Sequence, residues 1–402
     1  MSELYELPDG WEWSTLNDVC NKITDGTHKS PQTVEKGNPY ITVKDIDKNG
    51  NIDFYNCKFI SDEDFQLLID GNCMPNNGDV LFSKDGTVGK VALVNYETKF
   101  VVLSSLAILR PSDLILSQYL AKFLQSPLFL DKAIKSKTGA AIKRVVLRTI
   151  KSFKIPLPPL QEQKRIVAKL DALFDRIDKA IALHQQNINQ ADAFMGTVLN
   201  EVFEELEERY EIKTIEEISD NIRYGYTDSA KSEGNAVFIR ITDIAENGKF
   251  KNNFVYVQID NKELSKFKLH KGDILVARSG ATAGKVALFN LNNTAVFASY
   301  LIRIQPTKKV NSNFLFYFCH SSKYWEQLNK IKMGGAQPNV NASNLKQIKF
   351  PLPPLKTQQK TVAYLEQISS KIEQIKTLQS KKMQNLKELK ASLLDKAFRG
   401  EL

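Results

Sequence analysis

The chain has 402 residues, 42% of them hydrophobic and 25% charged, so it can form two or more folded domains and is not expected to be disordered. No apolar run reaches the roughly 18 residues of a membrane span, and residues 1–10 are acidic and polar, which excludes a signal peptide and predicts a cytoplasmic protein without a membrane partner. The four cysteines form no CxxC pair, which argues against zinc sites and a disulfide framework and predicts buried thiols.

The net charge of +9 is unevenly distributed along the chain. Residues 1–159 carry 19 basic and 19 acidic groups, whereas residues 210–354 carry 20 and 12. The net charge is −4 over residues 160–209 and +5 over residues 355–402. Residues 132–154 hold eight lysines and arginines and no acid, an excess typical of a phosphate-binding surface but also of a solvated helix face.

The first elements in chain order follow an aromatic opening at residues 11–13 (Trp-Glu-Trp). Residues 23–28 (Ile-Thr-Asp-Gly-Thr-His) contain a tight turn, and residues 222–226 (Ile-Arg-Tyr-Gly-Tyr) repeat it in shortened form. Residues 40–46 alternate apolar and polar side chains before an Asn-Gly turn, and residues 238–244 do the same. Alternation that ends in Asn-Gly predicts a strand followed by a hairpin-type turn.

The middle of each half has a strand, glycine-loop, strand pattern. Residues 78–93 and 272–288 both begin with Gly-Asp and end with Gly-Lys-Val-Ala-Leu, and one inserted residue separates the two copies. Helix-like segments follow near residues 117–135 and 312–332. Because the segments recur in the same order, the sequence predicts a duplicated domain.

Each copy ends in Pro-Leu-Pro-Pro-Leu-x-x-Gln, at residues 156–163 and 351–358, and then continues as an amphipathic helix. Apolar residues at alternating steps of three and four predict a coiled-coil seam, and each helix would extend roughly 70 Å. Their opposite charges favour pairing with one another, and an antiparallel pair is the simplest closure. The residues predicted for helix pairing or partner docking are Ile166, Leu170, Leu173, Ile177, Ile188, Val198, Leu365, Ile372, Ile375, Leu386, Leu389 and Leu393.

Together these patterns predict an α+β fold with a pseudo-two-fold internal repeat. Two homologous mixed α/β domains, residues 1–157 and 210–352, are separated by two long antiparallel coiled-coil helices, residues 158–209 and 353–402.

Catalytic motifs are not expected in this chain. The segment Gly280-Ala-Thr-Ala-Gly284-Lys285 is too short for a P-loop, and Val286 stands where Ser or Thr would bind magnesium. No GxGxxG, GxSxG or HExxH pattern occurs, and the four histidines are scattered. The sequence therefore predicts a non-catalytic chain without a metal site.

The loops of both copies carry hydrogen-bonding and basic side chains at equivalent places, whereas the framework residues repeat. Arg and Lys suit guanine edges and phosphates, and Asn and Gln suit adenine, so we expect DNA contacts from these loops. Ordinary surface drift after duplication explains the divergence of any single residue equally well. The candidates are Thr24, Asp25, Thr27, His28, Lys29, Lys84, Thr87, Lys90, Lys143, Arg144 and Arg148 in the first copy, and Arg223, Tyr224, Tyr226, Arg278, Ser279, Thr282, Lys285, Gln337, Asn339 and Asn341 in the second.

Over essentially its full length the chain resembles the specificity subunit of a type I restriction-modification system. The resemblance rests on the Trp11-Glu-Trp13 opening, the Asp25-Gly-Thr-His28 turn, the glycine loops, the two Pro-Leu-Pro-Pro-Leu-x-x-Gln helices and the Ala397-Phe-Arg-Gly-Glu-Leu402 segment. It implies that the domains are target-recognition domains, each reading one half of a bipartite asymmetric site in double-stranded DNA, and that the helices set their separation. One departure is Arg223-Tyr-Gly-Tyr226 at the second turn, where we expect a different DNA contact.

The resemblance also implies partners and cofactors. One copy of the chain would dock two modification subunits, which use S-adenosylmethionine to methylate adenine, and a restriction subunit, which uses ATP and Mg²⁺; the chain itself would hold no cofactor. Two other readings stay open from the residues alone. One is a DNA-modifying enzyme in its own right, a nuclease or methyltransferase, and the other is a coiled-coil adaptor that does not bind DNA.

Overall fold

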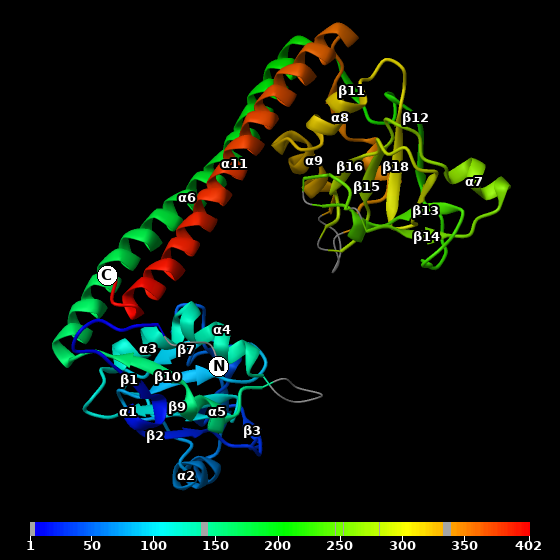
Figure 1. Cartoon of the computed structure of the whole chain (residues 1–402). Helices are drawn as coiled ribbons and strands as arrows, with labels where there is room; N and C mark the ends of the chain where they lie inside the picture. The colour runs from blue at the N-terminus through cyan, green and yellow to red at the C-terminus, as the bar shows by residue number, and fades with distance from the viewer. Residues whose placement is uncertain (1–4, 138–143, 246, 252, 281, 333–338) are drawn as a thin grey trace. The chain divides into compact units, whose positions relative to one another are not determined.

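The computed structural model describes residues 5–137, 144–245, 247–251, 253–280, 282–332 and 339–402 (Figure 1). The chain forms two compact units, of which the first contains residues 1–184 and 381–402 and the second residues 185–380. Each unit therefore combines one α/β domain with part of each long helix.

The first domain is built on an antiparallel four-stranded sheet of order β2-β9-β6-β7. A second sheet, of order β3-β5-β4-β8, pairs β4 with β8 in parallel, and β1 pairs with β10. The strand bounds are β1 (Glu12–Thr15), β2 (Cys20–Asp25), β3 (Thr33–Val34), β4 (Asn38–Ile41), β5 (Lys58–Ile60), β6 (Val80–Ser83), β7 (Val91–Leu93), β8 (Val101–Val102), β9 (Leu106–Pro111) and β10 (Lys154–Leu157).

Helices cover one face of the four-stranded sheet, and the second sheet covers the other. Val80 and Phe82 of β6 pack in a core with Phe123 and Phe129, whereas Leu81 packs in a separate core on the opposite face. This alternation follows from the two-residue period of a strand. The helices are α1 (Leu16–Val19), η1 (Val43–Asp45), α2 (Asp62–Asp70), α3 (Ser117–Gln125), α4 (Pro127–Lys135) and α5 (Leu147–Ser152).

The second domain repeats this arrangement, with sheets of order β12-β18-β15-β16 and β14-β13-β17 and the pair β11-β19. Its strands are β11 (Ile212–Thr214), β12 (Ser219–Tyr224), β13 (Ala236–Ile239), β14 (Val255–Val257), β15 (Ile274–Ala277), β16 (Val286–Leu288), β17 (Ala295–Phe297), β18 (Leu301–Pro306) and β19 (Lys349–Pro351). Its helices are η2 (Ile241–Asp243), α7 (Asn261–Phe267), α8 (Ser312–Phe318), α9 (Ser322–Lys332) and α10 (Ala342–Lys346). The predicted duplication and α+β class are confirmed.

Two predicted elements are shorter than the sequence pattern indicates. The strand expected over residues 40–46 ends at Ile41, because the Asp45 carboxylate accepts a hydrogen bond from the N–H of Thr42 at 2.7 Å and closes a 3₁₀ turn. In the second domain Asp243 bonds the N–H of Arg240 at 2.8 Å in the same way. The alternating pattern was ambiguous here because a capped 3₁₀ turn also places apolar residues on one side.

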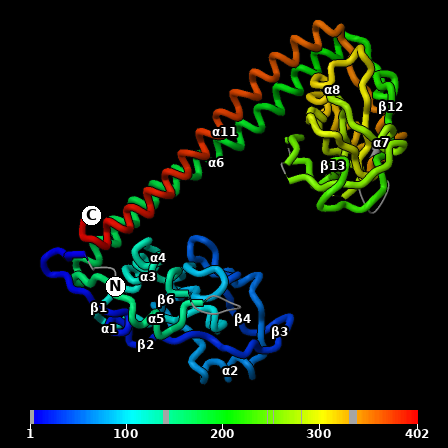
Figure 2. The backbone as a smooth tube through the Cα atoms, turned by 45° about the vertical axis from the view of Figure 1, so that its right-hand side comes forward, coloured from blue at the N-terminus to red at the C-terminus, as the bar shows by residue number. Residues whose placement is uncertain are grey.

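The long helices are α6 (Leu160–Arg209) and α11 (Leu355–Phe398), and within each unit they lie side by side and antiparallel (Figure 2). In the first unit Lys390 contacts Asp178 at 2.9 Å, and in the second Lys376 contacts Asp192 at 2.8 Å. Both pairs join a lysine of the basic helix to an aspartate of the acidic one, as the charge pattern predicts.

Parts of each helix belong to the domain cores. Ile166 and Leu170 of α6 pack with Phe398 of α11 in the helix-covered core of the first domain. Val198 of α6 and Leu365 of α11 pack in the corresponding core of the second domain. Each apolar stripe is therefore continuous with a domain, which supports a fixed attachment between domain and helix.

The heptad pattern predicts more buried residues between the two helices than the structure shows. Ile166, Leu170, Ile177, Val198, Leu365 and Ile372 are buried, and Leu173, Ile188, Leu386 and Leu393 are partly buried. Ile375 and Leu389, by contrast, are 45% and 46% exposed, so they do not fill a closed seam. A pair of helices buries a narrower face than a three-residue and four-residue pattern covers over many turns.

The N-terminal segment and the end of α11 are tied together in the first unit. The Tyr5 hydroxyl donates to the carbonyl oxygen of Phe398, and the Arg399 guanidinium lies 4.9 Å from the centre of the Tyr5 ring. Arg165 of α6 also donates to the carbonyl oxygen of Leu402 at 2.7 Å. Residues from both ends of the sequence thus complete the same fold.

All four cysteines are buried and free, as predicted, and burial raises the pKa of the Cys20 thiol to about 12. Among the described helices, none combines the length and hydropathy that a membrane span requires.

Candidate nucleic-acid interface

In both domains the same loops meet beside the glycine loop. The N–H of Lys84 donates to the carbonyl oxygen of Ser105 at 2.9 Å, and the N–H of Val145 donates to the carbonyl oxygen of Lys84 at 2.9 Å. In the second domain Arg278 donates to Tyr300 at 2.9 Å and accepts from Val340 at 2.8 Å. Side chains from loops far apart in sequence are thereby brought together at one surface of each domain.

A glycine allows the turn after β2 and β12 to approach the neighbouring backbone. A Cβ atom on Gly26 would lie 1.8 Å from the carbonyl oxygen of Val102, and one on Gly225 would lie 2.3 Å from that of Ala298. Only glycine fits at either position. The frame that positions the flanking side chains is therefore the same in both domains.

In the first domain the predicted contact residue Lys84 is buried between acids. Its Nζ atom lies 3.1 Å from Oδ2 of Asp25 and 3.7 Å from Oδ2 of Asp85, and its side chain is 4% exposed. Nε2 of the exposed His28 lies 3.3 Å from the other Asp25 oxygen. The buried and paired ammonium of Lys84 organises the loop in this structure, which does not favour the predicted contact with a phosphate.

Lys90 has a similar internal role. Its Nζ atom donates to the carbonyl oxygens of Val43, at 2.9 Å, and of Ile46, on either side of the end of η1. Carbonyl groups that a short helix leaves unpaired are natural acceptors for a lysine. Lys90 therefore holds η1 against the glycine loop, and the predicted DNA contact by its ammonium is not supported.

A groove of about 570 Å³ lies beside the glycine loop of the first domain. Thr87 and Arg144, both predicted, line this groove, and a single β-bridge joins Asp85 to Arg144. Lys44 and Lys58 also line it, although the sequence analysis did not single them out. The groove therefore presents three cationic side chains beside hydroxyl groups, a composition suited to phosphates and base edges.

The other predicted residues of the first domain lie around this cluster. The Thr27 hydroxyl is buried and donates to the carbonyl oxygen of Lys29 at 2.7 Å, which shapes the turn. Thr24 is partly buried on β2, Lys29 is exposed, and Arg148 is exposed on α5 outside the groove. Lys143 lies outside the described residues.

The second domain replaces the buried ion pair with an aromatic contact. The Arg278 guanidinium lies 4.7 Å from the centre of the Tyr224 ring, and the Tyr224 hydroxyl accepts a hydrogen bond from the N–H of Ala342 at 2.9 Å. Tyr224 occupies the position of Asp25, and Arg278 that of Lys84. A single β-bridge joins Ser279 to Asn339, as Asp85 is joined to Arg144 in the first domain. Tyr224, Arg278, Ser279 and Asn339 are therefore close together.

Three predicted residues of this domain serve its own structure. Arg223 donates to the carbonyl oxygen of Lys266 at 2.8 Å, and the Tyr226 ring packs 5.4 Å from that of Phe267. The Asn341 side chain caps α10 by accepting from the N–H of Asn344 at 2.7 Å. Sequence spacing could not separate these roles from DNA contact because all three lie in polar loops.

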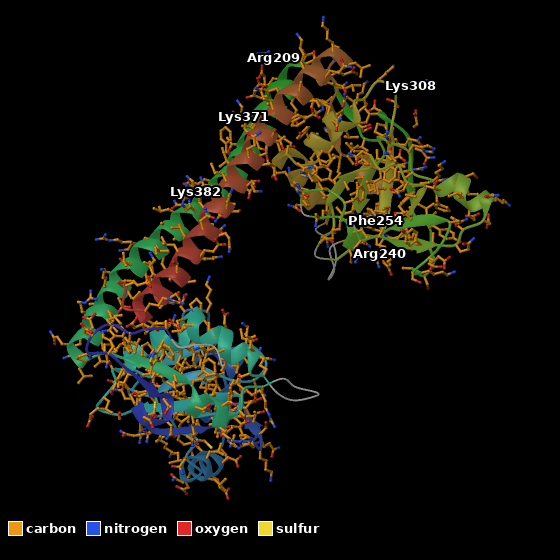
Figure 3. All side chains as sticks on the ribbon, in the orientation of Figure 1. Arg209, Arg240, Phe254, Lys308, Lys371 and Lys382 are labelled. Atoms are coloured by element: carbon orange, nitrogen blue, oxygen red, sulfur yellow. The ribbon has the colours of Figure 1, made fainter. Side chains whose placement is uncertain are left out.

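Thr282 is exposed and Lys285 partly buried in the second glycine loop, and Gln337 lies outside the described residues. Tyr300, which sequence reasoning missed, is 61% exposed directly after the turn that bonds Arg278. Arg240, labelled in Figure 3, was missed too; its guanidinium donates to Asp243 at 2.9 Å, which raises the pKa of Arg240. The sequence signal for Tyr300 was an aromatic residue at the position that Ser105 holds in the first copy.

Comparison with known proteins identifies the family of this chain. The family model described as the type I restriction modification DNA specificity domain matches residues 8–192 and 207–382. The EcoKI specificity subunit of Escherichia coli is 25% identical over 99% of this chain and 90% of the relative. The StySPI specificity subunit of Salmonella potsdam is 27% identical over the same shares of each chain.

Solved structures agree with this fold. A chain from a structure of type I restriction-modification complex assembly is 24% identical, has a TM-score of 0.75, and matches over 99% of this chain and 100% of that chain. The HsdS subunit of Thermoanaerobacter tengcongensis is 24% identical with a TM-score of 0.54, over 99% of each chain. The matching family is a DNA specificity domain and not a catalytic one. The chain therefore belongs to the DNA specificity family of type I restriction-modification systems.

Proposed function

We propose that each domain of this chain reads one half of a bipartite, asymmetric DNA site, and that the long helices fix the separation of the two halves. The observation that carries the proposal is the shared frame with exchanged side chains. The backbone hydrogen bonds beside the glycine loops are equivalent in the two domains, yet Asp25 and Lys84 are replaced by Tyr224 and Arg278. Two readers with one frame and different polar groups suit two different half-site sequences.

The helix pair supports a second role, the docking of modification subunits. It leaves large apolar side chains exposed in both units. Leu183 and Leu389 in the first unit and Phe194, Tyr364, Ile375 and Leu378 in the second are 45–60% exposed. Exposed apolar side chains on the helices of both units are compatible with two modification subunits bound to a single copy of this chain.

The remaining chemistry is assigned to the partners. S-adenosylmethionine would be bound by the modification subunits, and ATP and Mg²⁺ by the restriction subunit, so this chain would hold no cofactor. No group of three or more histidine, cysteine or acidic side chains that could hold a metal ion occurs among the residues the structure describes. The complex would act in the cytoplasm, where its DNA substrate is found.

The test is to sequence modified bases in DNA from cells that express this chain with its modification subunit. We expect methylation at one bipartite motif with a fixed spacer. The variants Arg144→Ala and Arg278→Ala should each relax a different half of that motif, with a discrimination loss of about 1–3 kcal/mol per base contact.

Other outcomes select the rival readings. Methylation or cleavage by the purified chain without a partner would identify a DNA-modifying enzyme. An adaptor without DNA contact would leave the motif unchanged in both arginine variants.

A further inference from the structure

Two buried glutamines occupy equivalent positions at the beginnings of the long helices. Gln163 lies in the first turn of α6 and Gln358 in the first turn of α11, and both side chains are fully buried. Burying an amide group destabilises the folded state unless its N–H donors and its oxygen acceptor are hydrogen-bonded. Both glutamines meet this condition in the same way.

Each amide joins its helix to the loop before a domain helix. Nε2 of Gln163 donates to the carbonyl oxygens of Leu114 and Pro158, and Oε1 accepts from the N–H of Leu116, all at 2.9 Å. Nε2 of Gln358 donates to Lys309 at 3.0 Å and Pro353 at 2.8 Å, and its Oε1 accepts from Asn311 at 2.7 Å. The sequence separations, 47, 49 and 5 residues, are identical in the two copies.

The bonded loops lead directly to the glycine-loop sheets. Leu116 is the N-cap of α3, which packs on β6 and β7, and Asn311 is the N-cap of α8, which packs on β16. The strands β6 and β7 carry the first glycine loop between them, and β15 and β16 carry the second. Each glutamine therefore links its long helix to a domain helix that packs on the strands beside the glycine loop, where the candidate DNA-contact residues lie.

We propose that Gln163 and Gln358 are positioning residues that lock each domain to its long helix and thereby make the complex selective for one spacer length. This inference rests on the proposed function. Without the amide, the apolar packing of Ile166 and Leu365 on the domain cores would remain, but the three directional hydrogen bonds that fix the angle between each domain and its helix would be lost, and the domain could tilt. One added base pair moves a half-site by roughly 3.4 Å and turns it by roughly 35°, so only a rigid junction excludes it.

The experiment uses the complex of this chain with its modification subunit and plasmids that carry both half-sites. The half-sites are separated by the native spacer or by one base pair more or less. The variants are Gln163→Leu and Gln358→Leu, which replace the amide with an apolar side chain of similar bulk and remove all three of its hydrogen bonds. The readout is methylation at altered spacers divided by methylation at the native spacer.

We expect this ratio to rise at least about tenfold in either variant, because the loss of even one hydrogen bond of ordinary net strength shifts a population by about that factor and each variant removes three. The matched controls are Ser126→Ala and Ser321→Ala. These buried serines are equivalent in the two copies, and their hydroxyls accept from the N–H groups of Phe129 and Tyr324 within the domains. The controls should lower total methylation without changing the ratio.

An unchanged ratio in the glutamine variants, with only total methylation reduced as in the serine controls, would overturn the inference. If Gln163→Leu fails to assemble, Gln163→Asn provides the same test, because its shorter amide cannot span the three partners. The failure of the proposed function is distinguishable, since the complex of the unaltered chain with the modification subunit would then methylate no bipartite site at all.

Discussion

The two glycine-loop surfaces share their backbone hydrogen bonds but differ in the side chains that contact one another. In the first domain a lysine at position 84 is neutralised by Asp25 and Asp85 beneath the surface. In the second an arginine at position 278 lies against the ring of Tyr224 and has no acid within ion-pair distance among the described residues. The backbone bonds around the two positions are otherwise equivalent. The domains therefore conserve the frame and vary the charge that they present.

This difference teaches where each domain keeps its cations. The first domain hides Lys84 and presents Lys44, Lys58 and Arg144 around its groove. Since a paired, buried charge contributes little attraction to a phosphate, the cations of the first domain that are available to a phosphate are those around the groove and not the lysine of the glycine loop. The second domain keeps its arginine beside exposed aromatic rings, where it can stack as well as donate.

The largest expected effect tests the part of the frame that the domains share. Gly26→Ala and Gly225→Ala should each destabilise the affected domain by at least about 3 kcal/mol, because the new Cβ would collide with backbone atoms. Calorimetric unfolding measures this. Gly196→Ala, in α6 where nothing lies within 4 Å of the added atom, is the control and should stabilise the chain by about 0.5–1 kcal/mol. Equal effects at Gly26 and Gly196 would contradict the close approach.

The second prediction sharpens the difference between the domains. Lys84→Met should destabilise the first domain by about 2–3 kcal/mol, because it leaves the mostly buried Asp25 carboxylate without its cation. Arg278→Met should change stability by only about 0.5–1 kcal/mol, the usual strength of a partly exposed cation–π contact. Thermal unfolding of both variants checks the contrast. Two equal losses would show that Arg278 is as integral to its domain as Lys84.

The smallest expected effect is on the salt dependence of DNA binding. The double variant Lys44→Ala with Arg144→Ala should flatten the slope of log Kd against log salt concentration by up to about two units if both side chains touch phosphates. Fluorescence anisotropy with the native motif measures the slope. Lys371→Ala with Lys382→Ala, on the exposed side of α11 (Figure 3), is the matched control and should leave it unchanged. An unchanged slope in the groove variant would locate the phosphate contacts elsewhere.

Much of the fold followed from repetition in the sequence. The copies at residues 78–93 and 272–288 predicted two equivalent sheets because a strand, glycine-loop, strand pattern is local. The long helices followed from the apolar period and the Pro-Leu-Pro-Pro-Leu segments for the same reason. Partner selection across 47 residues, as at Gln163, has no local signature and required the structure.

The candidate site was only partly predictable. Loop position drew attention to Arg144 and Arg278, whose roles stay predictions, but it could not tell that Lys84 and Lys90 turn inward, because their partners lie on other segments. Lys44 was missed since its segment looked like an alternating strand, and capping by Asp45 turned it into a 3₁₀ turn. Tertiary hydrogen bonds decide such orientations, and periodicity does not encode them.

The joining of Tyr5 to Phe398 also bears on the order in which the protein matures during synthesis. Domains generally fold as they leave the ribosome, N-terminal first. Here the second unit has all its residues once Ser380 has emerged, whereas the core of the first unit still lacks Leu394, Ala397 and Phe398. The domain that is made first is thus the last to complete its core, because Leu170 and Phe174 lack part of their apolar covering until residues 394–398 have been synthesised.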